Sequence, residues 1–300
     1  MHLPTNWFRL LCCLFLAVGS SASARASGRA TVLYDAFGNS GHLKKDWGFS
    51  VLIEYAGKKI LFDTGNDAGI FAANAHAMDV DLNDLDFVVI SHRHGDHTSG
   101  LNHLLKVNPK VKIYAPAELF GAFGSVLPKG FYKTVDTLPD HMRYFDGAEP
   151  KAFSSGSPWP EANFVWVDTA LEVAPGFFLI PTVSKVTGTL ELRELSLAID
   201  TPNGLALVVG CSHPGVEEIL TAASAVNSHV NLLLGGLHLV KTPDSDIESL
   251  ANALHGKWKI DRIAPGHYWR AGVRQAKTSF WRFLFICRSW ISRGYSVRLH

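Results

Sequence analysis

Three histidines and one aspartate fall within six consecutive positions of this chain. They are His92, His94, Asp96 and His97. Neutral imidazole binds zinc, copper, iron and nickel well, and a carboxylate adds charge and a contact to a second cation. Because one tetrahedral zinc ion cannot easily take four such close neighbours, we expect two cations about 3.5–4 Å apart. His92 and His94 would bind the first cation, and Asp96 and His97 the second.

An apolar, β-branched segment, Asp86–Ile90, directly precedes this motif. It predicts a buried strand, so the histidines would lie on a turn at the carboxyl end of that strand. The alternative is a polar loop that is rich in histidine by chance. We disfavour it, because each partly buried histidine would need a partner.

Two more histidines follow apolar segments in the second half of the chain. His213 comes after the predicted strand Leu205–Val209, and His267 comes after Ile260–Ile263. Both are candidate ligands, although His213 could instead cap the helix that follows and His267 could be structural. His238 follows Gly235-Gly236, and we expect it to face the substrate, with metal ligation or a structural role as alternatives.

Taken together, these motifs resemble the signature of the metallo-β-lactamase-fold hydrolases. His92-x-His94-x-Asp96-His97 and the turn Asp63-Thr64-Gly65 carry the resemblance to the superfamily. The other matching segments are Asp46–Ser50, Gly210–Gly215, Gly235–Leu239 and Ala264–His267. The whole set is most similar to the dihydropterin/ribofuranosylaminobenzene phosphate synthase-like branch. The resemblance covers roughly residues 30–268 and implies an α/β fold, a four-layer αββα sandwich.

The resemblance also implies a ligand set, with one departure from the superfamily. Many members supply a further histidine before the last strand pair and an aspartate that bridges two metals. Here residues 177–205 contain no histidine, and Gly210–His213 takes the place of that aspartate. The expected ligands are therefore His92, His94, Asp96, His97, His213 and His267. The cofactor would be one or two zinc ions, with manganese or iron as alternatives.

Three other residues have expected roles in this site. Asp63 would accept a hydrogen bond from a ligand histidine. Asp96 and His238 are the candidate catalytic residues, Asp96 because it can orient the nucleophile. Cys211 is a plausible soft ligand, but a small buried residue is the simpler interpretation.

The expected chemistry is hydrolysis by a metal-activated water, because metal binding lowers the pKa of water from about 15.7 to near 7. An ester, lactone, phosphoester or related bond of a small molecule would be the substrate. The branch resemblance implies instead a pterin-related phosphate synthase, which performs a condensation. A β-lactamase and a non-catalytic metal- or ligand-binding protein are the remaining alternatives.

Composition places the chain among globular proteins and argues against some partners. Apolar residues make up 47% of the 300 residues, charged residues 18%, and the net charge is +1. Acidic and basic residues are interspersed, so we expect no nucleic-acid partner. The oligomeric state cannot be inferred.

The first 24 residues read as a signal peptide rather than as part of the fold. Leu10–Val18 is a short apolar core, and Ala22-Ser23-Ala24 is typical of a cleavage site. We therefore expect a periplasmic or secreted protein without a stable membrane span. An uncleaved anchor, or a lipid anchor at Cys12 or Cys13, is the alternative. Removal of this segment leaves Cys211 and Cys287, too few for a disulfide framework.

Three further segments complete the expected organisation. Residues 25–268 would form the metallo-β-lactamase-like domain. Within it, residues 121–160 mix glycine, proline and aromatic residues without a period, and we interpret them as a lid insertion or a packed Ω-loop. Residues 269–300 form an atypical aromatic and basic tail, interpreted as an amphipathic helix or an out-of-frame ending.

Overall fold

The structure, a computed structural model, describes residues 28–36, 42–117, 159–186, 189, 192–239, 242–267 and 296–299. The expected signal peptide lies outside these residues. So do most of the expected lid insertion and most of the C-terminal tail.

Seven strands form the first sheet, in the order β13-β1-β2-β3-β4-β5-β6. Their bounds are Gly28–Tyr34 (β1), Ser50–Tyr55 (β2), Lys58–Phe62 (β3), Phe87–Val89 (β4), Lys112–Pro116 (β5), Asn163–Val167 (β6) and Ser296–Leu299 (β13). A hairpin joins β2 and β3 through Ala56 and Gly57, which both have positive φ, as a tight two-residue turn requires. β13 pairs antiparallel with β1, so the end of the tail is part of this sheet.

Six strands form the second sheet, in the order β12-β11-β10-β9-β8-β7. Their bounds are Leu171–Ala174 (β7), Phe177–Val183 (β8), Arg193–Thr201 (β9), Gly204–Val209 (β10), Val230–Gly236 (β11) and Arg262–Gly266 (β12). β10, β11 and β12 run parallel, so their carboxyl ends share one edge of the sheet. Every residue of β10 is buried, which explains its unbroken apolar sequence.

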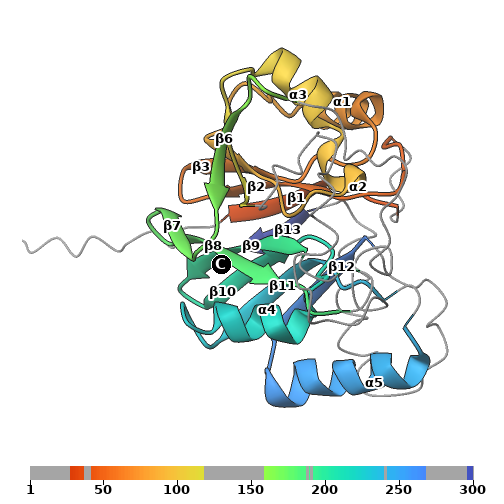
Figure 1. Cartoon of the computed structure of the whole chain (residues 1–300), viewed down its shortest axis with the longest axis vertical. Coiled ribbons are helices and arrows are strands. Elements are labelled where there is room, and N and C mark those ends of the chain that lie inside the picture. Colours follow the sequence, from red (N-terminus) through yellow and green to blue (C-terminus); the bar gives the residue numbers. More distant parts are fainter. Residues whose placement is uncertain are drawn as a thin grey trace, which may run out of the picture.

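Helices cover the outer face of each sheet (Figure 1). α1 (Ala68–Ala77) and α3 (Leu101–Val107) pack on the first sheet through Phe71 and Leu104, and the short α2 (Gly95–Thr98) precedes α3. α4 (Val216–Ala223) packs on the second sheet through Ile219. α5 (Asp244–Asn252) lies on the same side and runs into a π-helical turn, Ala253–Lys257.

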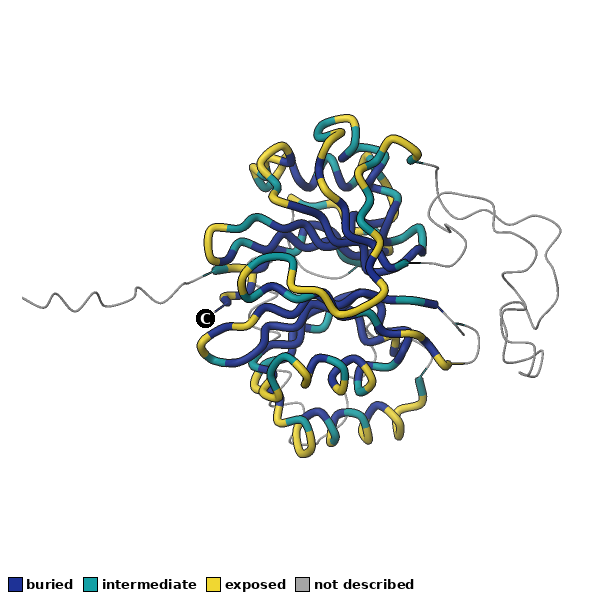
Figure 2. Tube along the Cα trace, turned by 60° about the vertical axis from the view of Figure 1, so that its left-hand side comes forward, coloured by how far each residue is buried: buried dark blue, intermediate teal, exposed yellow. Residues whose placement is uncertain are grey.

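The inner faces of the two sheets meet in a central apolar cluster. Val51 and Phe62 of the first sheet and Leu197, Val208 and Leu234 of the second belong to it, and all five are buried. Burial is concentrated along the sheets, and exposed residues lie on outer helices and loop tips (Figure 2). The expected four-layer αββα sandwich is therefore confirmed. Among the described residues, no helix combines the length and apolarity that crossing a bilayer requires.

Candidate metal centre

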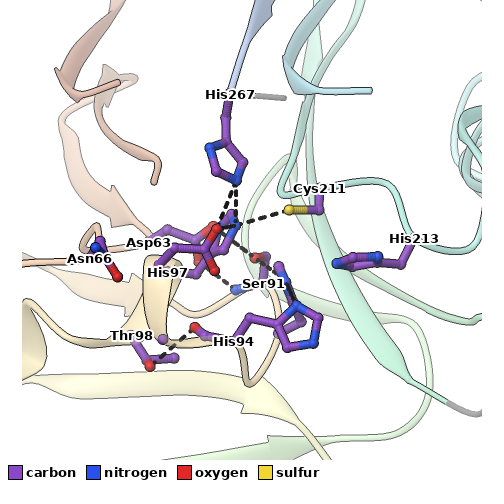
Figure 3. Close-up of polar contacts among 12 residues, drawn as sticks. Asp63, Asn66, Ser91, His94, His97, Thr98, Cys211, His213 and His267 are labelled. Atoms are coloured by element: carbon purple, nitrogen blue, oxygen red, sulfur yellow. Dashed lines mark hydrogen bonds and ion pairs between the residues drawn. The ribbon is translucent and has the colours of Figure 1, made fainter. Parts of the chain in front are cut away.

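Four turns at the carboxyl ends of strands bring the predicted site residues together (Figure 3). The turn after β4 carries the histidine motif, and the turn after β10 carries Cys211 and His213. β11 leads to His238, and β12 leads to His267. Residues that lie more than one hundred positions apart in the chain thus share one site, because the two sheets place these strand ends at a common edge.

The first group of potential ligands consists of His92, His94 and His213, whose ligand atoms all lie within 4.8 Å of one another. Nε2 of His92 lies 3.1 Å from Nδ1 of His94. The ring of His213 is 4.8 Å, centroid to centroid, from each of the other two rings. Both ring nitrogens of His213 are buried and have no hydrogen-bond partner among the described residues. A cation at this point would use a nitrogen that is otherwise unsatisfied.

The second group consists of Asp96, His97, Cys211 and His267, again with ligand atoms within 4.8 Å. Nε2 of His97 lies 3.1 Å from Sγ of Cys211 and 3.2 Å from Nε2 of His267. Nε2 of His267 lies 3.0 Å from Oδ2 of Asp96. Two imidazoles, a carboxylate and a thiol form a donor set that suits zinc.

His238 lies at the exposed rim of these groups. Its ring centroid is 4.5 Å from that of His213, and its φ is +52°. Its ligand atom forms a third group with those of Cys211 and His213. Trp47, which is 38% exposed, lies beside His267 with a ring separation of 5.3 Å. His238 is therefore placed where a substrate could reach it.

Most histidines of the site are held in the neutral form that a metal requires. Burial, helped by the neighbouring imidazoles, lowers the pKa of His213 to about 2. Burial likewise lowers the pKa of His94 to about 4 and that of His267 to about 4. The pKa of buried His92 is also lowered, well below its usual range. Converging neutral imidazoles offer lone pairs to a cation without competition from protons.

His97 differs because carboxylates surround it. Burial acts to lower the pKa of His97, but the charges of Asp63 and Asp96 outweigh burial and raise that pKa to about 9. Asp96 shows the reverse: burial acts to raise its pKa, but His97 and His267 keep it below its usual range. A cation would have to displace one proton from His97, so binding at the second group should release a proton.

Asp63 lies behind the histidine motif, as the sequence predicts. It is fully buried after β3, and Oδ2 accepts a hydrogen bond of 2.6 Å from Nδ1 of His97. The Ser91 amide donates to its Oδ1 and the Ser91 hydroxyl to its Oδ2, both at 2.7 Å. These bonds direct Nε2 of His97 toward the second group.

Two residues at the site were missed or undervalued in the sequence. Cys211 is buried among the ligand atoms of two groups, whereas its sequence context favoured a packing role. Burial raises the pKa of its thiol, so a thiolate here would depend on a bound cation. We call the turn that carries His92 to His97 the first metal turn and the turn that carries Cys211 and His213 the second metal turn. Glu194 of β9 is fully buried beside the second metal turn, and burial raises its pKa to about 7. An acidic residue within an apolar strand pattern is the signal that marks Glu194.

The geometry brings all six predicted ligands into two adjacent groups, and their binding of a cation stays a prediction. Comparison with known proteins agrees with the fold. The sequence profile described as the metallo-beta-lactamase superfamily matches residues 47–199, a little over half of the chain. The chain belongs to the metallo-beta-lactamase superfamily. Its expected family and fold are thereby confirmed.

This metallo-beta-lactamase superfamily member has curated relatives in Methanocaldococcus jannaschii. One is a 7,8-dihydropterin-6-methyl-4-(beta-D-ribofuranosyl)-aminobenzene-5'-phosphate synthase, 27% identical over 239 residues that cover 73% of this chain and 80% of the relative. The match agrees with the branch indicated by the sequence motifs. Another is the uncharacterized protein MJ0448, 36% identical over 210 residues that cover 68% of this chain and 77% of the relative.

Solved structures of the superfamily share this fold. Tm1679, described as a metal-dependent hydrolase of the beta-lactamase superfamily, superposes with a TM-score of 0.63 and 22% identity, covering 91% of this chain and 98% of its own. The metallo-beta-lactamase fold protein YhfI from Bacillus subtilis gives a TM-score of 0.51 and 13% identity, with coverage of 92% and 100%. At these identities the likeness concerns the fold.

Proposed function

We propose that this protein is an exported metal-dependent hydrolase that acts on an ester, lactone, phosphoester or related bond of a small molecule. One observation carries the proposal. Two groups of potential ligand atoms, those of each group within 4.8 Å of one another, lie side by side at the ends of strands from both sheets. Zinc is the proposed cation, with manganese or iron as alternatives.

Individual residues of the site have the following proposed roles. A cation held by either group of ligand atoms would supply the Lewis acidity needed to acidify a water molecule and polarise a substrate oxygen. Asp96 accepts a hydrogen bond from the attacking water and so orients it. His238, exposed at the rim, donates a hydrogen bond to the substrate. Asp63 keeps His97 in the tautomer whose Nε2 faces the cation.

A substrate panel tests this proposal. Purified protein is assayed with ester, lactone, phosphodiester and β-lactam substrates, with and without chelator. We expect turnover of at least one class, its loss with chelator, and its loss in His94→Ala with the fold retained. His76→Ala is the matched control, because His76 is an exposed histidine of α1. Unchanged turnover in His94→Ala would refute the proposal, and nitrocefin turnover would make the enzyme a β-lactamase.

A synthase is the second candidate, because the relative with 80% of its length matched bears that name. The assay is formation of the aminobenzene-5'-phosphate compound in that name from its pterin and ribofuranosylaminobenzene precursors. Product formation without hydrolysis in the panel would favour the synthase. Stoichiometric metal binding with neither activity would favour a non-catalytic binding protein.

Export is a separate part of the proposal. It is supported by the apolar segment Leu10–Val18 and the small residues Ala22-Ser23-Ala24. Mass spectrometry of the protein from its native host tests it. A mature chain that begins near residue 25 is expected in the periplasm or medium, whereas an intact Met1 on cell-internal protein would overturn export.

A further inference from the structure

Two adjacent residues of β9, Glu194 and Leu195, each contact one of the two metal-ligating turns. The backbone amide of Leu195 donates a hydrogen bond of 2.7 Å to the carbonyl of Ser91, at the start of the histidine motif. The carboxylate of Glu194 accepts hydrogen bonds from the backbone amides of Ser212, at 2.8 Å, and His213, at 2.9 Å. β9 therefore joins the turn that carries His92 and His94 to the turn that carries His213.

The turn at Ser212 needs such an anchor because its backbone is strained. Ser212 has a φ of +61°, a left-handed conformation that a residue with a side chain rarely adopts. The turn also packs tightly, since a Cβ on Gly210 would lie 2.3 Å from Oγ of Ser91. The hydroxyls of Ser212 and Ser184 fix it further, by donating to the carbonyls of Gly236 at 2.7 Å and His213 at 3.0 Å.

Glu194 supplies the only acceptors that the structure assigns, within its described residues, to the two amides of this turn. Without its carboxylate, two buried N–H groups would lose their partners, at a cost of about 1–3 kcal/mol each. Neither oxygen of Glu194 belongs to a group of potential ligand atoms among the described residues. Within the described residues, the hydrogen bonds of Glu194 therefore reach the first group of ligands through the backbone amide of His213.

We propose that Glu194 is a positioning residue, whose two backbone hydrogen bonds hold the imidazole of His213 in place to complete the group with His92 and His94. This inference rests on the proposed metal centre. The carboxylate would do for the second metal turn what Asp63 does for the first. Each turn would then have one fully buried carboxylate behind it.

Cobalt(II) titration of the purified protein tests this role, with d–d absorption and stoichiometry as readouts. In Glu194→Gln, which replaces one acceptor oxygen by a donor, we expect a 10–100-fold loss of cobalt affinity at the His92, His94 and His213 group. Glu172→Gln is the matched control. Glu172 also accepts a hydrogen bond from a backbone amide, that of Gly176, at 2.9 Å. It lies on β7, and within the described residues it belongs to no group of potential metal ligands. The cobalt affinity of the Glu172→Gln protein should equal that of the unmodified protein.

A double variant distinguishes positioning from general support of the fold. Once His213→Ala has removed the imidazole, adding Glu194→Gln should cost no further cobalt affinity, because Glu194 acts through His213. Additive losses, or equal affinity of Glu194→Gln and the unmodified protein, would overturn the inference. If Glu194→Gln does not fold, Glu194→Asp is titrated instead, with a smaller loss expected and unchanged affinity overturning the inference. Failure of the unmodified protein to bind cobalt would instead refute the metal centre itself.

Discussion

The Nδ1 atom of His97 lies 2.6 Å from Oδ2 of Asp63, and both side chains are fully buried. Such a pair holds a hydrogen on Nδ1, so the proton that a cation displaces from His97 leaves from Nε2, which faces Cys211 and His267. Ser91 donates to the same carboxylate, so the pair also ties the end of β3 to the first metal turn.

Replacing Asp63 by asparagine should weaken metal binding more than it weakens the fold. Asp63 has a φ of +56°, which asparagine tolerates, so the backbone can stay as it is. The asparagine side chain has no charge, and its NH2 group would face the Ser91 amide or Nδ1 of His97, which are themselves hydrogen-bond donors. We expect a 10–100-fold lower zinc affinity, measured by competition with a chromophoric chelator.

The control for this variant is Asp84→Asn, which removes an exposed carboxylate paired with Lys59. Surface ion pairs contribute about 0–1 kcal/mol, so its stability and zinc affinity should change little. Equal zinc affinity in Asp63→Asn and Asp84→Asn would contradict the role of Asp63.

Gly100→Ala should disrupt the first metal turn for a purely steric reason. Its φ of −65° is ordinary, but a Cβ there would lie 2.1 Å from the carbonyl oxygen of Thr64. Thr64 in turn donates to the carbonyl of His97 through its amide, at 2.8 Å, and its hydroxyl, at 2.9 Å. We expect a loss of about 1–3 kcal/mol in the free energy of unfolding, measured with urea.

Gly256→Ala is the matched substitution at an open position, since no atom lies within 4 Å of a Cβ there. It should leave the free energy of unfolding within about 0.5 kcal/mol. A Gly100→Ala protein as stable as Gly256→Ala would show that Thr64 can move aside, and would contradict the tight approach of these turns.

The sequence could predict the strand ends that carry the ligands, because apolar β-branched segments followed by histidines are a local pattern. Local signals also mark the hairpin at Ala56-Gly57 and the end of α3, which runs from Leu101 to Val107 and stops before Pro109. The pairing of these turns across two sheets follows from topology, and the family resemblance supplied that topology.

Other features depend on contacts that no local pattern encodes. β13 follows an aromatic and basic segment, yet Leu299 is fully buried and pairs with Gly28 of β1. The contact of Cys211 with His97 joins residues 114 positions apart, and the role of Glu194 follows only from where the second metal turn lies. Tertiary position, rather than propensity, decided all three.

The metal-free protein should lose stability as the pH falls below about 6.5. Four histidines of the site have a pKa lowered by desolvation: His92, His94, His213 and His267. In the unfolded chain each takes up a proton near pH 6.5. In the fold the pKa is about 4 for His94 and His267, about 2 for His213, and well below its usual range for His92. The unfolded state therefore binds more protons in this range, and stability decreases with falling pH.

Three groups oppose this trend, because a raised pKa favours the fold as the pH falls. Burial raises the pKa of Glu194 to about 7 and also raises that of Asp63, whereas the charges of Asp63 and Asp96 overcome burial and raise the pKa of His97 to about 9. Below about pH 6.5 the unfolded His97 is protonated as well, so its opposing effect fades and the four histidines dominate. We expect a net loss on the order of 1 kcal/mol or more per pH unit between pH 6.5 and 5. The urea midpoint of chelator-treated protein at pH 6.5, 6.0 and 5.5 measures it. A midpoint that stays level or rises toward pH 5.5 would contradict the lowered pKa values.

Cys211→Ser should change which cations the second group prefers. Serine keeps the size of the side chain but replaces a soft thiolate by a hard hydroxyl, which suits zinc and cobalt poorly and deprotonates far less readily. We expect lower zinc affinity, a smaller change for manganese, and loss of the sulfur-to-cobalt charge-transfer absorption in the cobalt form.

Sγ of Cys211 lies 3.1 Å from Nε2 of His97, so its removal should act on the second group most directly. The cobalt d–d bands from the group of His92, His94 and His213 should persist, although Cys211 precedes His213 by two positions. Retention of the charge-transfer band in Cys211→Ser would contradict thiolate ligation, because Cys211 is the only free cysteine among the described residues. Loss of the charge-transfer band together with all d–d bands would mean that cobalt binding at both groups of ligands depends on Cys211.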